Sequence, residues 1–290
     1  MVKLGFVILN YNTSKETEEC IISIQRLIDI PKEEYIVAVV DNGSEHESVD
    51  RLKSVYSTEG NIIFIENGSN LGFACGNNVG IRFLNDNYAP EFIVVLNSDT
   101  ELIQNNLYEN VLTEFQRSKF ALLGPMMITA DGRCNDSPWK PSDYEKVKSK
   151  LRELKCKQAY YNIHLEVLWK LYNWVMEHIS KNDKSIHESD TFWEYHKQVE
   201  LQGAFLIFSK EAFKCINGFD DRTFLYYEEQ ILYQMLVKQN QTIVYTPQII
   251  VFHKEGKSTK KIKRNREKAI FLNDCNIKSL SVLLSMMEEG

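Results

Sequence analysis

The sequence lacks several features that would assign a protein to a class at once. Its six cysteines lie far apart and form no CxxC pair, so neither a zinc site nor a disulfide framework is indicated. Positive charge is scarce: 34 Lys and Arg against 40 Asp and Glu give a net charge of −6, which leaves no electrostatic footprint for nucleic acid. No apolar run approaches the roughly 20 residues that span a bilayer.

Two nucleotide-binding motifs are also absent. The glycines Gly72, Gly76 and Gly80 are spaced four apart, not in the G-x-G-x-x-G pattern of dinucleotide binders, and no G-x-x-x-x-G-K-[ST] occurs. A nicotinamide oxidoreductase and a P-loop protein are therefore disfavoured. Glycines at a helix start allow a ligand close to the backbone, and they equally allow close packing of the helix on a sheet.

What is present is typical of a soluble globular protein, with 43% hydrophobic and 26% charged residues over 290 positions. The N-terminal segment MVKLGFVILNYN enters a strand pattern almost at once and lacks the layout of a signal peptide. We therefore expect a cytoplasmic protein with reduced thiols. A net-negative protein that binds an anionic ligand needs a metal ion, backbone N–H groups or a helix N-terminus to help.

Strand and helix patterns alternate through residues 1–125. Thr13 and Glu16 form a capping-box pattern before the first helix. Nearly continuous apolar strands suit a parallel sheet that is covered on both faces, so we expect a doubly wound α/β fold. The expected strands are 4–9, 35–40, 61–65, 92–96 and 120–124, and the expected helices are 14–28, 47–56, the segment after residue 78 through about 84, and 107–115.

The alternation breaks after residue 125. Residues 126–200 are rich in Lys, Glu, Trp and Tyr, and 146–179 reads as one or two amphipathic helices of an insertion. Further strands are expected at 203–208, 242–246 and 249–253, with a helix at 228–238, so that 201–256 completes the sheet. The last part, 257–290, holds a basic stretch, KKIKRNREK, and an amphipathic helix at 271–287.

Polar residues follow three of the expected strands at their carboxyl ends, where ligands bind in open parallel sheets. Any one of them reads equally well as the start of a polar loop. Together they favour a polar crevice, formed by Asn10, Tyr11 and Asn12 after the first strand, Asp41 after the second, and Asn97, Ser98 and Asp99 after the fourth.

The chain resembles the family 2 glycosyltransferases in seven ordered motifs. They cover nearly all of it except the insertion, and the nearest likeness is to rhamnosyltransferase-like members that build bacterial surface polysaccharides. The motifs are VILNYN, VVDNGS, NLGFACGNNVGI, VLNSDTEL, GAFLIF, GFDDRTFLYYEEQILYQ and VFHKEGKS.

The resemblance implies a GT-A-like fold, a nucleotide-diphosphate-sugar donor, UDP- or dTDP-linked, and an inverting transfer to a hydroxyl of a glycan or lipid-linked glycan. Residues 1–125 would bind the donor, and 126–200 would help to bind the acceptor. Asp41 would bind the nucleobase. The other nucleotide-pocket residues would be Asn10, Tyr11, Asn12, Asn70, Gly72, Asn77, Asn97 and Ser98.

The resemblance also implies a divalent metal, Mn²⁺ or Mg²⁺, and a catalytic base. Asn97-Ser98-Asp99 matches the family's metal-binding Asp-x-Asp with Asn in first place, so Asp99 would be the direct ligand and His253 the second. Glu228-Glu229 replaces the family's usual Glu-Asp, so Glu229 would be the base, with Glu228 as a substitute. Gln202, Gly203 and Ala204 would lie under the acceptor and the sugar.

Several alternatives stay open at this point. A lone histidine after an apolar strand is often structural, and two acids at a helix start are often solvated and stabilised by the helix dipole. The four tryptophans suit sugar stacking or core packing. The basic stretch suits a solvated face, or a peripheral contact with the inner face of a membrane. The chain as a whole could also be a catalytically silent sugar-nucleotide-binding module.

Overall fold

The computed structural model describes residues 1–130, 132, 134, 138–163, 167, 171, 191–254 and 266–289, with the backbone alone at 46–48 and 191. The strands are β1 (Leu4–Asn10), β2 (Tyr35–Asp41), β3 (Ile62–Glu66), β4 (Phe92–Asn97), β5 (Thr100–Leu102), β6 (Leu122–Thr129), β7 (His196–Lys197), β8 (Phe205–Ser209) and β9 (Ile243–His253). The α-helices are α1 (Ser14–Leu27), α2 (His46–Val55), α3 (Gly72–Asn87), α4 (Leu107–Ser118), α5 (Tyr144–Asn162), α7 (Glu228–Lys238) and α9 (Arg266–Glu288).

Within the described residues the strands form one sheet in the order β3-β2-β1-β4-β8-β6-β9-β5, with β7 pairing β9. The first four strands are mutually parallel. β8 is antiparallel to both β4 and β6, and β6 runs parallel to β9. The sheet is therefore mostly parallel, and strands from residues 1–125 and 201–256 belong to the same sheet.

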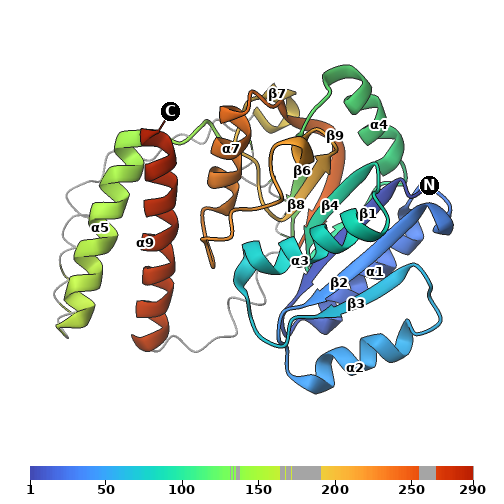
Figure 1. Cartoon of the computed structure of the whole chain (residues 1–290), viewed down its shortest axis with the longest axis horizontal. Coiled ribbons are helices and arrows are strands. Elements are labelled where there is room, and N and C mark those ends of the chain that lie inside the picture. The colour runs from blue at the N-terminus through green and yellow to red at the C-terminus, as the bar shows by residue number, and fades with distance from the viewer. Residues whose placement is uncertain are drawn as a thin grey trace.

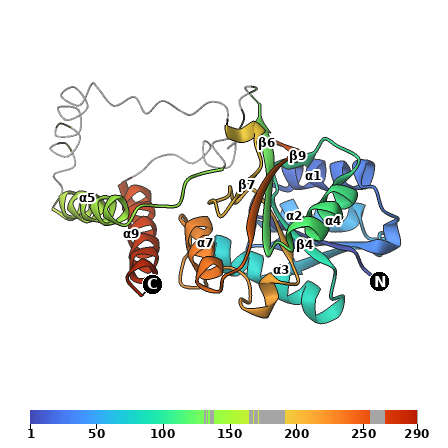
Figure 2. The same ribbon diagram turned by 90° about the horizontal axis from the view of Figure 1, so that it is seen from above.

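Helices cover both faces of the sheet, as the continuous apolar strands predict (Figures 1 and 2). The strand residues alternate between two cores: Val37 and Val39 of β2 face the same core as α1, α2 and α4, whereas Ala38 and Val40 face the core shared with α3 and α7. The doubly wound fold expected from the sequence is confirmed.

A third, smaller core joins α5 and α9 to α7. Leu151 of α5, Leu283 of α9 and Ile231 of α7 are all buried in it. Figures 1 and 2 show α5 and α9 side by side beyond α7, and Figure 1 shows them far from β3. This packing places the C-terminal helix next to the N-terminal end of α7, where Glu228 and Glu229 lie.

Several element boundaries differ from expectation. Residues 243–253 form one strand rather than two, because β9 continues past the irregularity where its register with β6 shifts at Pro125/Met126. The short strands β5 and β7 were not expected. α5 ends at Asn162, and the rest of the expected helical stretch to 179 lies mostly outside the described residues, as do Trp169, Trp174 and most of KKIKRNREK. Trp193 is 61% exposed and so is not a core residue.

Candidate active site

The polar residues at the strand ends lie on one edge of the sheet. Asn10 of β1 lies opposite Asp41 of β2, and Leu9 of β1 lies opposite Asn97 of β4. The three strands are parallel, so their carboxyl ends meet at this edge. The shared polar edge predicted from the sequence is confirmed.

Asn10 is fully buried, and the protein itself uses its whole hydrogen-bonding capacity. Its Nδ2 donates to Asp41 Oδ1 at 2.9 Å and to Ser44 Oγ at 3.1 Å. Its Oδ1 accepts from the hydroxyls of Thr13 and Thr17. Asn10 therefore orients Asp41 and offers no free polar group of its own to a ligand.

The expected capping box at Thr13 is wrong. The Thr13 side chain caps no N–H of α1. Its hydroxyl instead donates to Asn10 Oδ1 at 3.2 Å and lies 2.9 Å from Ser98 Oγ. The hydroxyl thereby links the end of β1 to the segment after β4, which a local sequence pattern cannot show.

Asp41 is 5% exposed, and its Oδ2 accepts from the backbone N–H of Ser44 at 3.2 Å. Asn12 adopts a left-handed conformation, φ 56°, and its Oδ1 accepts from the N–H of Glu45 at 2.9 Å. Tyr11, which lies between Asn10 and Asn12 in the sequence, is exposed. Asn10 and Asn12 thus hold the segment after β2 in place around Asp41.

Asn42, which sequence reasoning missed, organises the neighbouring loop. Its Nδ2 donates to Asn70 Oδ1 at 3.0 Å and to the carbonyl of Gly72 at 3.1 Å. Its Oδ1 accepts from Asn67 Nδ2 and from the N–H of Leu71, both at 3.1 Å. In the sequence, only the position of Asn42 directly after Asp41, at a strand end, could have indicated this role. Asn42 connects the β2 end to the start of α3.

Asn70 and Gly72 lie in this network, and Asn77 lies one turn further along α3. Asn70 Oδ1 accepts from the N–H of Gly72 at 2.9 Å. Asn77 is fully buried; its Nδ2 donates to the Phe73 carbonyl at 3.0 Å, and its Oδ1 has no hydrogen-bond partner among the described residues. Asn77 therefore packs inside the protein next to the loop rather than on its surface.

Asp99 and His253 meet across β5 and β9. His253 Nε2 lies 3.3 Å from Asp99 Oδ1, and both side chains are mostly buried. The N–H of Lys254 donates to the Asp99 carbonyl at 3.0 Å, which fixes the two segments together. The ammonium of Lys254 is paired with Glu19 and Glu101. The carboxylate and the imidazole predicted as metal ligands are thus brought together.

The Asp99–His253 geometry fits a divalent metal. Two ligand atoms at adjacent octahedral positions, each about 2.1 Å from an ion, lie about 3.0 Å apart, close to the observed 3.3 Å. In the part of the chain that the structure describes, no three His, Cys, Asp or Glu side chains converge on a common point. An ion held here would therefore take its remaining ligands from a substrate and from water, as Mg²⁺-type sites commonly do.

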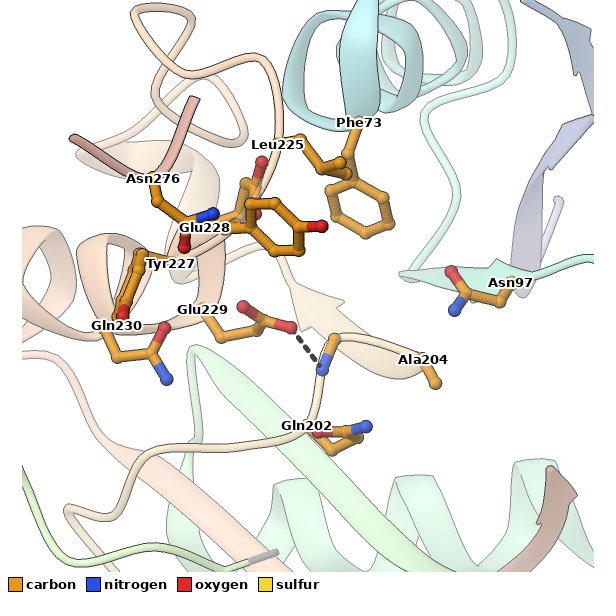
Figure 3. Close-up of a pocket in the computed structure, with 12 residues that line it drawn as sticks. Phe73, Asn97, Gln202, Ala204, Leu225, Tyr227, Glu228, Glu229, Gln230 and Asn276 are labelled. Carbon is orange, nitrogen blue, oxygen red and sulfur yellow. Dashed lines mark hydrogen bonds between the residues drawn. The ribbon is translucent and has the colours of Figure 1, made fainter. Parts of the chain in front are cut away.

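A pocket of about 370 Å³ opens at the N-terminal end of α7 (Figure 3). It contains the predicted acceptor residues and the predicted base, together with residues that the sequence did not single out. It is lined by Phe73, Asn97, Gln202, Gly203, Ala204, Leu225, Tyr226, Tyr227, Glu228, Glu229, Gln230 and Asn276. Asn276 comes from α9, so the C-terminal helix contributes to the pocket.

Glu229 reaches into this pocket and is held by Gly203. Its Oε1 accepts from the N–H of Gly203 at 3.1 Å, the contact drawn in Figure 3. A Cβ added at Gly203 would lie 2.4 Å from the same oxygen, so only glycine permits this approach. Burial raises the pKa of Glu229, while hydrogen bonds from its own N–H and that of Gly203 oppose the rise.

Glu228 is more deeply buried than its neighbour, with 5% of its surface exposed. Its Oε1 has no hydrogen-bond partner among the residues described. Burial, and then the charge of Glu229, raise its pKa to about 8. Glu228 is therefore mainly neutral at pH 7, and it is not a solvated acid.

Burial also raises the pKa of Glu200, whose carboxylate accepts from the N–H and hydroxyl of Ser142.

Glu228 makes the free energy of unfolding depend on pH. Its pKa rises from the ordinary 4.5 to about 8 on folding, so in this range the folded state keeps a proton that the unfolded state releases. Its contribution is complete below about pH 4.5 and is lost as pH rises through about 8, with a slope of up to about 1.4 kcal/mol per pH unit. Urea unfolding of Glu228→Gln, which stays neutral, is expected to show a flatter profile than the wild type; equal slopes would contradict this pKa.

Most of the predicted site residues fall into three groups. Asn10, Asn12 and Asp41 interlock after β1 and β2. Asp99 and His253 form the second group, and the pocket residues form the third. The Ala204 carbonyl joins the last two, because it accepts from the N–H of Asn97 at 3.0 Å and from the Thr100 hydroxyl at 3.2 Å. The roles of these residues stay predictions.

Comparison with known proteins agrees with this architecture. The model of glycosyl transferase family 2 matches residues 6–216, well over half of the chain. Over 136 residues the chain is 28% identical to the low-salt glycan biosynthesis hexosyltransferase Agl10 of Haloferax volcanii; the match covers 47% of this chain and 40% of that protein.

Among solved structures, TarS 1–349 of S. aureus in complex with UDP-GlcNAc is similar, with a TM-score of 0.53 and 14% identity over 98% of this chain and 70% of that one. GalNAc-T7 with UDP, GalNAc and Mn²⁺ gives a TM-score of 0.57 and 11% identity over 87% of this chain and 44% of that one. These likenesses confirm the GT-A-like fold.

The chain belongs to glycosyl transferase family 2. The segment matched to the curated hexosyltransferase spans less than half of that protein's length.

Proposed function

We propose that the protein is a metal-dependent inverting glycosyltransferase. It would move a hexosyl or deoxyhexosyl group from a UDP- or dTDP-sugar to a hydroxyl of a glycan in cell-surface polysaccharide synthesis, with rhamnose as one candidate sugar. The observation that carries the proposal is that one pocket holds Glu229, while Asn97 of the same pocket lies two residues from the Asp99–His253 pair.

On the donor side, Asp41 would hold the nucleobase. Its carboxylate is kept in place by Asn10 and by the N–H of Ser44, so it is preorganised for a base N–H donor. Asn42, Asn70 and Gly72 would line the neighbouring part of the nucleotide site, since their hydrogen bonds fix the loop that opens α3.

Asp99 and His253 would hold Mn²⁺ or Mg²⁺. When bound, such an ion supplies Lewis-acid stabilisation of the charge that develops on the departing diphosphate. A metal ion would be needed for this charge, because Lys254, the residue next to His253, already forms ion pairs with Glu19 and Glu101. An imidazole ligand suits a transition metal better than Mg²⁺, which favours Mn²⁺.

Glu229 would act as the base in a direct displacement. The acceptor hydroxyl loses its proton to the Glu229 carboxylate while its oxygen forms a bond to the anomeric carbon. The bond from that carbon to the phosphate oxygen breaks on the opposite side, and its electron pair leaves with the nucleoside diphosphate. The raised pKa of Glu229 makes it a stronger base, at the cost of a smaller ionised fraction at low pH.

The pocket beside Glu229 would receive the acceptor. Aromatic rings of Phe73, Tyr226 and Tyr227 and the amides of Gln202, Gln230 and Asn276 line it, a combination suited to a sugar with apolar faces and hydroxyl edges. A lipid-linked acceptor would place the enzyme at the inner face of a membrane. Across the described part of the chain, no helix is long and apolar enough to cross a membrane.

Calorimetric titration of UDP and of dTDP, each with and without Mn²⁺, tests the donor and metal assignments. We expect one nucleotide to bind tightly and only when the metal is present. If neither nucleotide binds to folded protein under any of these conditions, the donor-site assignment fails and Asn97-Ser98-Asp99 is only a strand end.

A second candidate is a catalytically silent sugar-nucleotide-binding module. Two departures from the family pattern favour it, namely Glu229 in place of Asp and Asn97 in place of the first metal-triplet Asp. Donor hydrolysis without an acceptor would exclude this candidate, because a silent module binds the sugar nucleotide without breaking the bond to the phosphate.

A further inference from the structure

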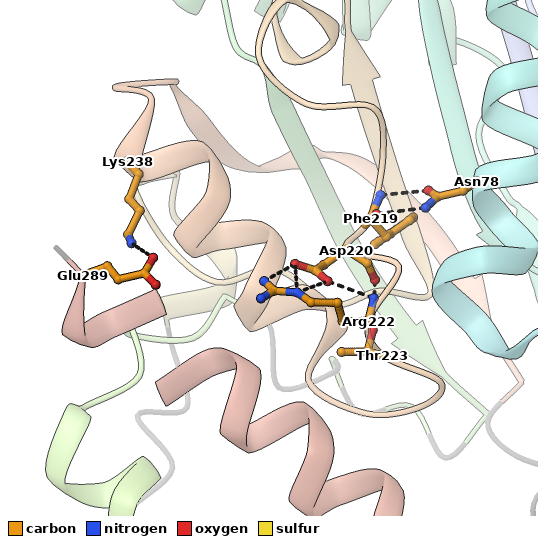
Figure 4. Close-up of polar contacts among 7 residues, drawn as sticks. All are labelled: Asn78, Phe219, Asp220, Arg222, Thr223, Lys238 and Glu289. Atoms are coloured by element: carbon orange, nitrogen blue, oxygen red, sulfur yellow. Dashed lines mark hydrogen bonds and ion pairs between the residues drawn. The ribbon is translucent and has the colours of Figure 1, made fainter. Parts of the chain in front are cut away.

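The loop of residues 217–227 connects β8 and its following turn to the pair Glu228-Glu229, and α3 holds it. Asn78 of α3 is 4% exposed and meets the backbone of Phe219 with both atoms of its amide. Its Nδ2 donates to the Phe219 carbonyl and its Oδ1 accepts from the Phe219 N–H, each at 2.8 Å (Figure 4). Two parallel hydrogen bonds fix orientation as well as distance.

Glycine is required on both sides of the contact between α3 and this loop. Gly218 has φ 124°, and a Cβ there would lie 2.2 Å from Asn78 Oδ1. Gly72, at the start of α3, has φ 82°, and a Cβ there would lie 2.4 Å from the Phe224 carbonyl. That carbonyl accepts from the N–H of Phe73 at 2.8 Å. The loop is therefore fastened to α3 near both of its ends.

The loop is also braced internally. The Asp220 carboxylate accepts from the backbone N–H of Arg222 at 2.9 Å and from its guanidinium, and the Thr223 hydroxyl donates to the Asp220 carbonyl (Figure 4). Burial alone would raise the pKa of Asp220, but the hydrogen bonds and the charge of Arg222 bring it below its usual value. A displacement at Phe219 is therefore passed along the loop rather than absorbed by it.

The far end of the loop is strained. Tyr226 and Tyr227, which line the pocket directly before Glu228, have φ of 76° and 63°. Non-glycine residues rarely adopt this left-handed region, and they keep it only where contacts with the surrounding structure hold them there. The surroundings here are α3 on one side and α9 on the other, where the Ser279 hydroxyl donates to the Leu225 carbonyl at 3.1 Å.

We infer that Asn78 is a positioning residue for Glu229, acting through residues 217–227. Asn78 does not line the pocket. Without its two hydrogen bonds, the loop relaxes the left-handed tyrosines and moves the start of α7. Glu229 then leaves the Gly203 N–H. The inference rests on the proposed role of Glu229 as the base.

The test is Asn78→Ala, with kcat, donor Kd and the pH profile measured separately. We expect kcat per donor-binding site to fall by about 100-fold, the effect of an ångström-scale misplacement, while the donor Kd stays within about twofold. Loss of the Gly203 hydrogen bond raises the pKa of Glu229, so the acid limb of the kcat profile should move to higher pH. The stoichiometry of donor binding, measured by calorimetry, gives the concentration of folded sites. The kcat can therefore be calculated per folded site even when part of the sample is unfolded.

Asn87→Ala is the matched control. Asn87 lies on the same helix and is exposed, and its Nδ2 donates to the Phe83 carbonyl at 2.8 Å, away from the loop. This variant should keep the wild-type kcat and acid limb. A kcat for Asn78→Ala within about threefold of the control, or an unmoved acid limb, would overturn the inference.

Two more variants separate positioning from general damage. Asn78→Asp restores both hydrogen bonds only when its carboxyl is protonated, so its kcat relative to wild type at the same pH should rise as pH falls; a constant ratio would count against the inference. Gly218→Ala pushes on Asn78 Oδ1 from the loop side and should reproduce the Asn78→Ala profile. If Glu229→Gln transfers sugar at the wild-type rate, the proposed base role of Glu229 fails, whatever the Asn78 variants show. If Glu229→Gln is inactive but Asn78→Ala behaves like its control, only the positioning role of Asn78 fails.

Discussion

Replacing Glu229 with Gln is expected to lower kcat for sugar transfer by at least about 10³-fold while leaving the donor Kd almost unchanged. The amide keeps the volume of the side chain and can still accept from the Gly203 N–H, but it cannot take a proton from an acceptor hydroxyl. The proposed donor residues lie in other segments, after β1, β2, β3 and β4. Steady-state transfer kinetics and calorimetry with the nucleoside diphosphate separate the two effects.

Glu211→Gln is the control for this change. Glu211 is paired with Lys214 on the surface, outside the pocket, so the same chemical substitution should leave kcat within about twofold of wild type. Glu228→Gln is a second comparison, since Glu228 is already mainly neutral at pH 7 and should tolerate the change far better than Glu229. Equal losses at both positions, or turnover that survives in Glu229→Gln, would remove Glu229 from the base role.

Replacing Asp99 with Asn should abolish the dependence of donor binding on Mn²⁺. The substitution keeps the shape and removes the charge that a hard divalent ion requires. We expect UDP or dTDP to bind this variant in Mn²⁺ as weakly as wild type binds in the presence of a chelator, and kcat to fall by about 10²- to 10³-fold. His253→Ala should weaken Mn²⁺-dependent binding more than Mg²⁺-dependent binding, because it removes the nitrogen ligand.

The control for Asp99 is Asp86→Asn, an exposed change near the end of α3 that should preserve metal dependence. If Asp99→Asn retains the full effect of Mn²⁺ on nucleotide affinity, the ion binds elsewhere and the Asp99–His253 pair is structural. This result would leave the fold and the pocket assignments intact, because neither depends on the ion.

The fold was predictable because its signals are local and periodic. The strand of residues 35–41 is apolar at every position but the last, and such a run requires cover on both faces; the structure places α1 and α2 on one side and α3 on the other. β5 and β7, with three and two residues, have too short a pattern to show in sequence. The two expected strands at 242–246 and 249–253 merge into β9, which stays paired with β6 on both sides of the register shift.

Site residues could be predicted where a polar side chain follows a strand end or a segment matches a family motif. They could not be predicted where their position depends on contacts between residues far apart in the sequence. Asp41 and Asp99 stand at strand ends, and Glu229 stands in a motif. Nothing local marks Asn78, whose amide meets a backbone 141 residues away, or Asn276, which reaches the pocket from the last helix. Only the contact of α3 with the 217–227 loop and the packing of α9 against α7 bring these two residues to their positions.

Release of nucleoside diphosphate from a panel of UDP- and dTDP-sugars, measured for wild type and Glu229→Gln in Mn²⁺, tests the central claim most directly. The account predicts slow release by wild type from at least one sugar nucleotide, even with water as the acceptor, a much slower release by the variant, and the same sugar nucleotide as the preferred donor with a glycan acceptor. If folded wild type binds a nucleotide in Mn²⁺ but releases none from any donor, with or without glycan acceptors, the protein is a sugar-nucleotide-binding module and the proposed transferase activity is wrong.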